Sequence, residues 1–67
     1  MKIRFLKNIT VEIFNVSFGN NDVWEKFYRK WDTIEIVSHE KDGNRSTVYL
    51  EDGDIIINVP NDAFEII

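Results

Sequence analysis

The chain has 67 residues, a formal net charge of −4 at pH 7, no cysteine and a hydrophobic content of 43%. This length specifies one domain, and the lack of cysteine excludes disulfides and thiolate metal sites, so apolar side chains alone must build the core. No apolar run approaches the ~20 residues of a membrane-spanning helix, and the first residues alternate in polarity instead of forming a signal peptide, so we expect a cytoplasmic protein without a membrane partner.

The first two segments of the chain have the pattern of strands. Apolar and polar residues alternate in "KIRFLK" and again in "ITVEIF", as they do in strands with one buried face. Ile3 and Phe5 share a face in the first segment. Ile9, Val11 and Ile13 share a face in the second, so we predict two strands that direct these side chains into the core.

The segment "DVWEKFYRKW", residues 22–31, fits two structures. In a helix, Asp22 caps the N-terminus, Glu25 completes a capping box and the aromatic residues form one stripe. In extended structure, the same residues form the returning arm of a long loop. Because only ten residues are available, we predict a loop or irregular strand with at most one helical turn.

The second half of the chain has the pattern of an antiparallel meander. Alternation predicts strands near residues 33–40, 45–51 and 54–59. The turn "KDGNR" between the first two is assigned a three-residue loop, Asp42–Asn44, because that length places apolar residues opposite one another.

The turn between the last two strands of the meander predicts their register. Asp-Gly at positions 52–53 is a strong signal for a two-residue turn, because both central positions need positive φ. Leu50 then faces Ile55 across the hairpin. Val48 likewise faces Ile57, so we predict that Ile55 and Ile57 point into the core.

The last ten residues, "NVPNDAFEII", describe a strand, a turn and a second strand. Pro60 lacks a backbone donor and fixes φ, so it ends the preceding strand. Asn61 and Asp62 favour a tight turn. Phe64 and Ile66 can then return to the core in a short final strand.

This ending is similar to that of the Src-homology-3 fold, in which a strand finishing in Val-Pro leads into one 3₁₀ turn and a final short strand. "FYRKWDTIEIV" resembles the turn and strand that follow the long first loop of that family. The resemblance covers roughly residues 9–67 as a pattern of strands and turns. It implies an all-β fold for residues 1–67, a small Src-homology-3-like barrel of five or six antiparallel strands with one short helical turn.

The chain lacks the aromatic residues with which the family binds proline-rich peptides. Ser46 and Thr47 stand where a tryptophan opens the third strand, and Ala63 replaces the tyrosine that follows the closing proline. Trp31 stands where the family usually has glycine. The resemblance therefore implies the fold without the peptide groove, and a fold of this kind serves many unrelated functions.

Aromatic and basic residues interleave in residues 18–31, and tryptophan and tyrosine are favoured anchors of protein interfaces. Two interpretations remain open for the aromatic residues, since they can form the lid of a small core or a surface that binds a partner. The predicted protein-binding residues are Phe18, Trp24, Tyr28, Trp31, Lys26, Arg29 and Lys30.

These residues predict a non-enzymatic protein-binding module. Bacterial and phage proteins often use such barrels for binding, and the abundance of Ile, Asn and Lys is compatible with an AT-rich genome, so we expect a phage or prophage protein that modulates a host protein. One alternative is a small nucleic-acid-binding barrel, which the −7 charge balance of residues 31–67 disfavours. Another is a structural subunit that forms a homo-oligomer through a strand edge.

No cofactor, metal site or catalytic activity is predicted. His39 is the one histidine, and its chain neighbours point to the opposite face of a strand, so it lacks the partners of a general base. The acidic stretch "EDGD", residues 51–54, has too few oxygen ligands at the wrong spacing for a calcium loop and is interpreted as a hairpin turn.

Overall fold

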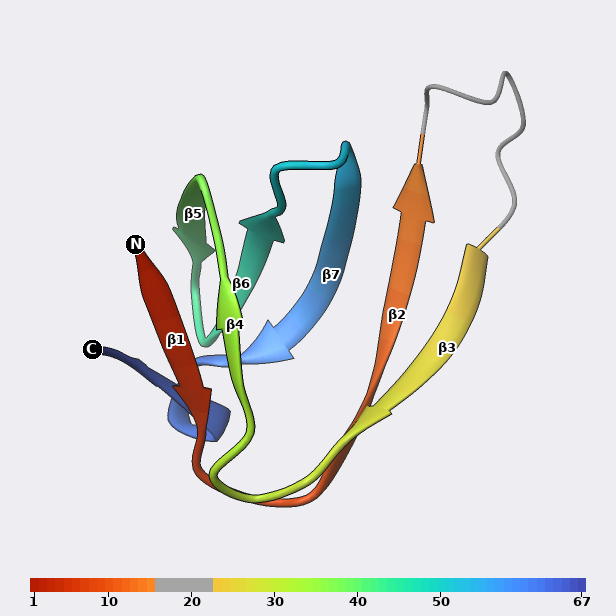
Figure 1. The fold of residues 1–67 in the computed structure, drawn as a ribbon. Helices are drawn as coiled ribbons and strands as arrows, with labels where there is room; N and C mark the ends of the chain where they lie inside the picture. Colours follow the sequence, from red (N-terminus) through yellow and green to blue (C-terminus); the bar gives the residue numbers. More distant parts are fainter. Residues whose placement is uncertain (16–22) are drawn as a thin grey trace.

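The computed structural model describes residues 1–15 and 23–67, which form eight strands and one 3₁₀ turn (Figure 1). The prediction of an all-β chain is confirmed. The strands are β1 (Lys2–Phe5), β2 (Ile9–Asn15), β3 (Val23–Tyr28), β4 (Thr33–Glu35), β5 (Ser38–Asp42), β6 (Arg45–Tyr49), β7 (Asp54–Pro60) and β8 (Phe64–Ile66). The 3₁₀ turn, η2 (Asn61–Ala63), comes directly before β8. In the described ranges no helix is long and apolar enough to cross a membrane.

The strands form two antiparallel sheets, one of three strands in the order β4-β1-β8 and one of five in the order β3-β2-β7-β6-β5. The sheets are not closed into a barrel, which corrects the predicted closure, and the described strands number eight where five or six were expected (Figure 1). The cause lies in the segment predicted as one strand at 33–40. The Ile36 amide donates to Met1 O (2.8 Å) in the smaller sheet, and the Val37 amide donates to Tyr49 O (2.8 Å) in the larger one. The chain therefore changes sheets at these two residues, and the outer edges of β3, β4, β5 and β8 pair with no described strand.

The core lies between the two sheets. Four of the five side chains predicted to point inward from the first two strands are buried, and the fifth, Ile9, is half-buried and packs against them. The alternation in these segments therefore identified the buried face correctly. The buried apolar residues are Ile3, Phe5, Val11, Ile13, Tyr28, Ile36, Val48, Ile56, Val59, Ala63 and Phe64.

The register of β6 and β7 differs by one residue from the prediction. Val48 faces Ile56, not Ile57, and Ile56 is completely buried. The turn contains three residues instead of two, because the Leu50 amide donates to Asp54 O at 2.9 Å. Gly53, with φ of 94°, is its last residue, as in a type I turn that ends in a glycine bulge. The additional loop residue exchanged the inner and outer faces of β7.

A bulge in β7 corrects the alternation further along the strand. Val48 faces Ile56 but Ser46 faces Val59, so β7 holds one extra residue. Asn58 adopts a left-handed φ of 58° there, a conformation that asparagine tolerates better than most residues. Ile56 and Val59 are consequently both buried, although an unbroken strand would direct them to opposite faces.

The β5–β6 turn, in contrast, is shorter than the predicted three residues. Asp42 faces Arg45, so the loop contains two residues, Gly43 and Asn44, and Gly43 has a φ of 66°. The C-terminal prediction is confirmed for the order of elements, because β7 ends at Pro60, η2 follows and β8 pairs with β1. Phe64 is buried as predicted, but Ile66 is exposed and does not return to the core.

Candidate protein-interaction edge

Residues 23–28, predicted as a loop or irregular strand, form the regular strand β3. It pairs with β2 in six consecutive steps, from Ile9 opposite Tyr28 to Phe14 opposite Val23. Branched and aromatic residues dominate the segment and fit a pleated sheet, which explains why the helical alternative is wrong. β3 is the last strand of the larger sheet, outermost in Figure 1, and no described strand pairs with its other edge.

One face of β3 carries Trp24, Lys26 and Tyr28, which share the inner face of the sheet with the β2 residues opposite them. Tyr28 is buried, and its ring stacks on the ring of Phe5 with centroids 4.4 Å apart and planes 12° apart. It is therefore a core residue, which corrects its prediction as an exposed anchor. The end of β3 brings Tyr28 against the smaller sheet, where Phe5 lies, and this position follows from the tertiary packing.

The other aromatic residues of the segment are exposed. Trp24 is 41% exposed and Trp31 is 59% exposed, so neither is a buried core residue. Phe27, on the outer face of β3, is 54% exposed. Phe27 is not among the predicted protein-binding residues. As consecutive residues of a strand, Phe27 and Tyr28 point to opposite faces, so the burial of Tyr28 leaves Phe27 on the exposed face. Phe18 lies outside the described residues.

Trp31 has an unusual backbone conformation. It is the third residue of a turn closed by the Asp32 amide, which donates to Arg29 O at 3.0 Å, and its φ is 78°. This φ is typical of the third position of type II turns, where glycine is preferred, and is a genuine outlier for a bulky residue. The Arg29 amide donates to Asp32 Oδ2 (2.8 Å) and the Trp31 amide to Phe5 O (2.7 Å), so hydrogen bonds fix the turn.

The basic residues near β3 differ from those near β1 in their ion pairing. Lys2, Arg4 and Lys7 each lie within 4 Å of a carboxylate, at 3.9, 3.4 and 3.3 Å. The basic residues of the β3 region form no ion pair within the described part of the chain, although the protein has an excess of acidic groups. They are Lys26, Arg29 and Lys30.

Two of these basic groups lie over aromatic rings instead. Lys26 Nζ is 5.2 Å from the centroid of the Tyr28 ring, and Lys30 Nζ is 5.0 Å from that of Trp31. Cation–π contacts of this kind hold an ammonium group without neutralising its charge. The structure thus gathers six of the seven predicted residues in 24–31, five of them exposed and Tyr28 in the core.

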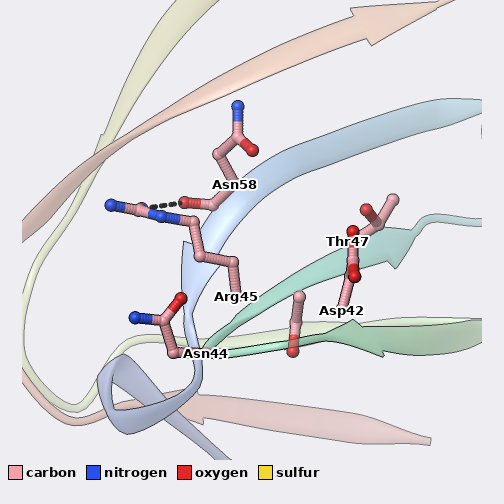
Figure 2. Close-up of a pocket in the computed structure, with 6 residues that line it drawn as sticks. Asp42, Asn44, Arg45, Thr47 and Asn58 are labelled. Atoms are coloured by element: carbon pink, nitrogen blue, oxygen red, sulfur yellow. Dashed lines mark hydrogen bonds between the residues drawn. The ribbon is translucent and has the colours of Figure 1, made fainter.

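Away from this edge, one pocket is lined by His39, Lys41, Asn61, Phe64, Glu65 and Ile66. A polar pocket lies where β5, β6 and β7 meet, and Figure 2 shows its one cationic side chain, Arg45, donating to Asn58 O at 2.9 Å. No group of three or more potential metal ligands is present in the described ranges. His39 is half-buried with its ring edge-on to Phe64, and its buried Nδ1 has no hydrogen-bond partner among the described atoms.

No protein-family model matches the chain, and no curated protein and no solved structure shows significant similarity to it. Only the sequence and the geometry of the chain itself therefore bear on its function.

Proposed function

We propose that the chain is a non-enzymatic protein-binding module that contacts its partner through the β3 edge surface. This surface combines the exposed residues of β3 with those of the following turn. They are Val23, Trp24, Glu25, Lys26, Phe27, Arg29, Lys30 and Trp31.

The observation that carries the proposal is the state of Trp31. A non-glycine residue in the left-handed region costs about 1–3 kcal/mol, and a side chain that is 59% exposed returns only part of its possible burial energy. Two unfavourable features thus coincide in one residue of a small domain. A partner that covers the indole would supply the missing burial, and tryptophan is a frequent anchor of protein interfaces.

The free edge of β3 supports a particular mode of binding. An extended segment of the partner can add to such an edge as a further strand, so that backbone hydrogen bonds give affinity and side-chain contacts give specificity. Lys26, Arg29 and Lys30 would then favour acidic groups on the partner and accelerate its association. The affinity should consequently fall as the salt concentration rises.

The finer features of the proposal come from the sequence. The strand, proline, 3₁₀ turn and strand at the C-terminus support a Src-homology-3-like arrangement of the strands. The high content of Ile, Asn and Lys supports a bacterial or phage genome. We accordingly propose a phage or prophage protein whose partner is a cytoplasmic host protein.

The test is affinity capture from a bacterial lysate with the tagged protein as bait, read by mass spectrometry. Trp31→Gly is the matched control, because it removes the indole and is compatible with the local backbone. We expect a protein that the wild-type bait retains after nuclease treatment and that Trp31→Gly loses. An identical set of captured proteins for both baits would contradict the proposal.

Single-stranded nucleic acid is a second candidate ligand. Exposed aromatic rings beside unpaired cations can stack bases and neutralise phosphates, and Trp24, Lys26 and Trp31 provide both. The net charge of −4 opposes this function. A nucleic-acid-binding function predicts that captured material disappears on nuclease treatment. It also predicts that Lys26→Ala weakens binding and makes the affinity less dependent on salt.

A further inference from the structure

The pocket lined by β5, η2 and β8 lies at the end of the larger sheet opposite β3. β5 is the last strand of the larger sheet and β8 is the last strand of the smaller one, so the pocket lies where the two sheets meet without pairing. Its volume is about 220 Å³. Sites for drug-sized molecules measure ~300–1,000 Å³, so this pocket suits a smaller occupant.

The lining of the pocket has one positive charge without a partner. Lys41 forms no ion pair with any residue that the structure describes. The acidic residue of the lining, Glu65, faces Arg4 across β1 and β8, and Arg4 Nη1 lies 3.4 Å from Glu65 Oε1. The charge of Glu65 is therefore already balanced. A ligand with a single negative charge would balance Lys41.

The ring of His39 supplies a hydrogen-bond donor to the same pocket. A neutral imidazole carries one proton, either on Nδ1 or on Nε2. Nδ1 is buried and has no hydrogen-bond partner among the described atoms. Buried donors without an acceptor are rarer than buried acceptors without a donor, so we assign the proton to Nε2. Nε2–H is then free to donate to a ligand.

The two donors lie on the same face of β5. His39 faces Val48 and Lys41 faces Ser46 on the neighbouring strand β6, and both β6 residues are buried. Side chains directly opposite each other share a face of the sheet. His39 and Lys41 therefore belong to the inner face of β5, two positions apart, and a single small anion can accept a hydrogen bond from each.

The remaining wall of the pocket is mostly apolar. The Phe64 ring lies edge-on to His39, with centroids 6.4 Å apart. Ile66 is 49% exposed, so its side chain can still gain from burial. Asn61 already accepts a hydrogen bond from Ser46 and donates one to Gly43 O. An occupant thus meets two donors on one side and a hydrocarbon surface on the other.

We propose that this pocket binds a small aliphatic monocarboxylate. Its carboxylate accepts hydrogen bonds from Lys41 Nζ and His39 Nε2, and its hydrocarbon chain packs against Phe64 and Ile66. Inorganic phosphate fits less well, because the lining has no cation for a second negative charge and Glu65 repels it. The site is at the opposite edge of the sheet from β3, so it goes beyond the proposed function and does not depend on it.

The test is a titration of the ¹⁵N-labelled full chain with 4-methylpentanoate at pH 7, followed by two-dimensional NMR. We expect a dissociation constant on the order of 1 mM for a ligand of this size. The shifts should change at residues 39–41 and 61–66 and at the ring nitrogens of His39, which are unambiguous because the chain has one histidine. The uncharged analogue 4-methylpentanamide has the same shape and should bind at least about tenfold more weakly.

Variants test the two donors separately. Lys41→Met keeps much of the side chain and removes the charge, so we expect the dissociation constant to rise about tenfold or more. His39→Phe keeps a ring and removes the donor, and it should raise the constant about fivefold. Lys2→Met on β1 removes one exposed cation outside the pocket and is the matched control, which should leave the affinity unchanged. Circular dichroism confirms that each variant is folded.

Four results would overturn the proposal. The first is the absence of any shift change up to about 20 mM 4-methylpentanoate. The second is equal affinity for the carboxylate and the amide. The third is an equal loss of affinity in Lys41→Met and Lys2→Met, which would indicate a general effect of charge. The fourth is binding of the peptide acetyl-Gly-Gly-Leu more than about tenfold tighter than 4-methylpentanoate, because the pocket would then serve the C-terminus of a polypeptide.

Discussion

The ring of Tyr28 stacks on the ring of Phe5 with centroids 4.4 Å apart, and this contact joins the two sheets. Tyr28 ends β3 in the larger sheet, and Phe5 ends β1 in the smaller one. Both rings are buried. The residue that sequence analysis assigned to the binding surface therefore belongs to the contact that positions β3 against the core.

Replacing Tyr28 should unfold much of the protein. Tyr28→Ala removes a buried ring and leaves Phe5 without its stacking partner, so we expect the free energy of unfolding to fall by about 3–5 kcal/mol. Tyr28→Phe retains the ring and should change it by less than about 1.5 kcal/mol. Urea denaturation followed by tryptophan fluorescence measures both, and equal losses for the two variants would contradict the role of the stacked ring.

Replacing Trp31 should separate stability from binding. Trp31→Gly relieves the positive φ and loses a mostly exposed side chain, so we expect the free energy of unfolding to change by less than about 1 kcal/mol. Partner capture should be lost. A loss of about 3 kcal/mol or more in thermal or urea denaturation would show instead that the indole belongs to the core.

The hydrogen bond between the Ser46 hydroxyl and Asn61 Oδ1 should couple β6 to η2. Ser46 is buried, and Asn61 Nδ2 also donates to Gly43 O at 3.0 Å. Asn61→Ala leaves the hydroxyl without its partner, and we expect a loss of about 1–3 kcal/mol. In a double-mutant cycle with Ser46→Ala, the two losses should not add, whereas additive losses would contradict the coupling.

Replacing Asn58 by glycine should destabilise the protein less than replacing it by valine. Its φ of 58° is accessible to glycine and strained for a β-branched residue. Asn58→Gly should leave the free energy of unfolding within about 0.5 kcal/mol of wild type, while Asn58→Val should lower it by about 1–2 kcal/mol. Urea denaturation measures the difference, and equal stability of the two variants would contradict the bulge.

Neutralising one glutamate of the Glu12–Glu25 pair should stabilise the protein slightly. The two residues face each other on β2 and β3, and like charges in that position are unfavourable. Glu12→Gln should raise the free energy of unfolding by about 0.2–1 kcal/mol at low salt, and the gain should shrink at high salt. Glu40→Gln on β5 is a control that should show no such gain.

The sequence by itself determined the all-β class, the buried face of the first two strands and the strand, proline, 3₁₀ turn and strand at the C-terminus. These features depend on alternation and on the chemistry of proline, which act within a few residues. Tertiary structure decided the remainder. The three-residue turn ending at Gly53 and the bulge at Asn58 determine which residues of β7 are buried. Alternation alone could not predict them, because it identifies the two faces of a strand but not the register that decides which face is buried. Packing against Phe5 made Tyr28 a core residue, and the lack of a described strand beside β3 made its edge the candidate surface.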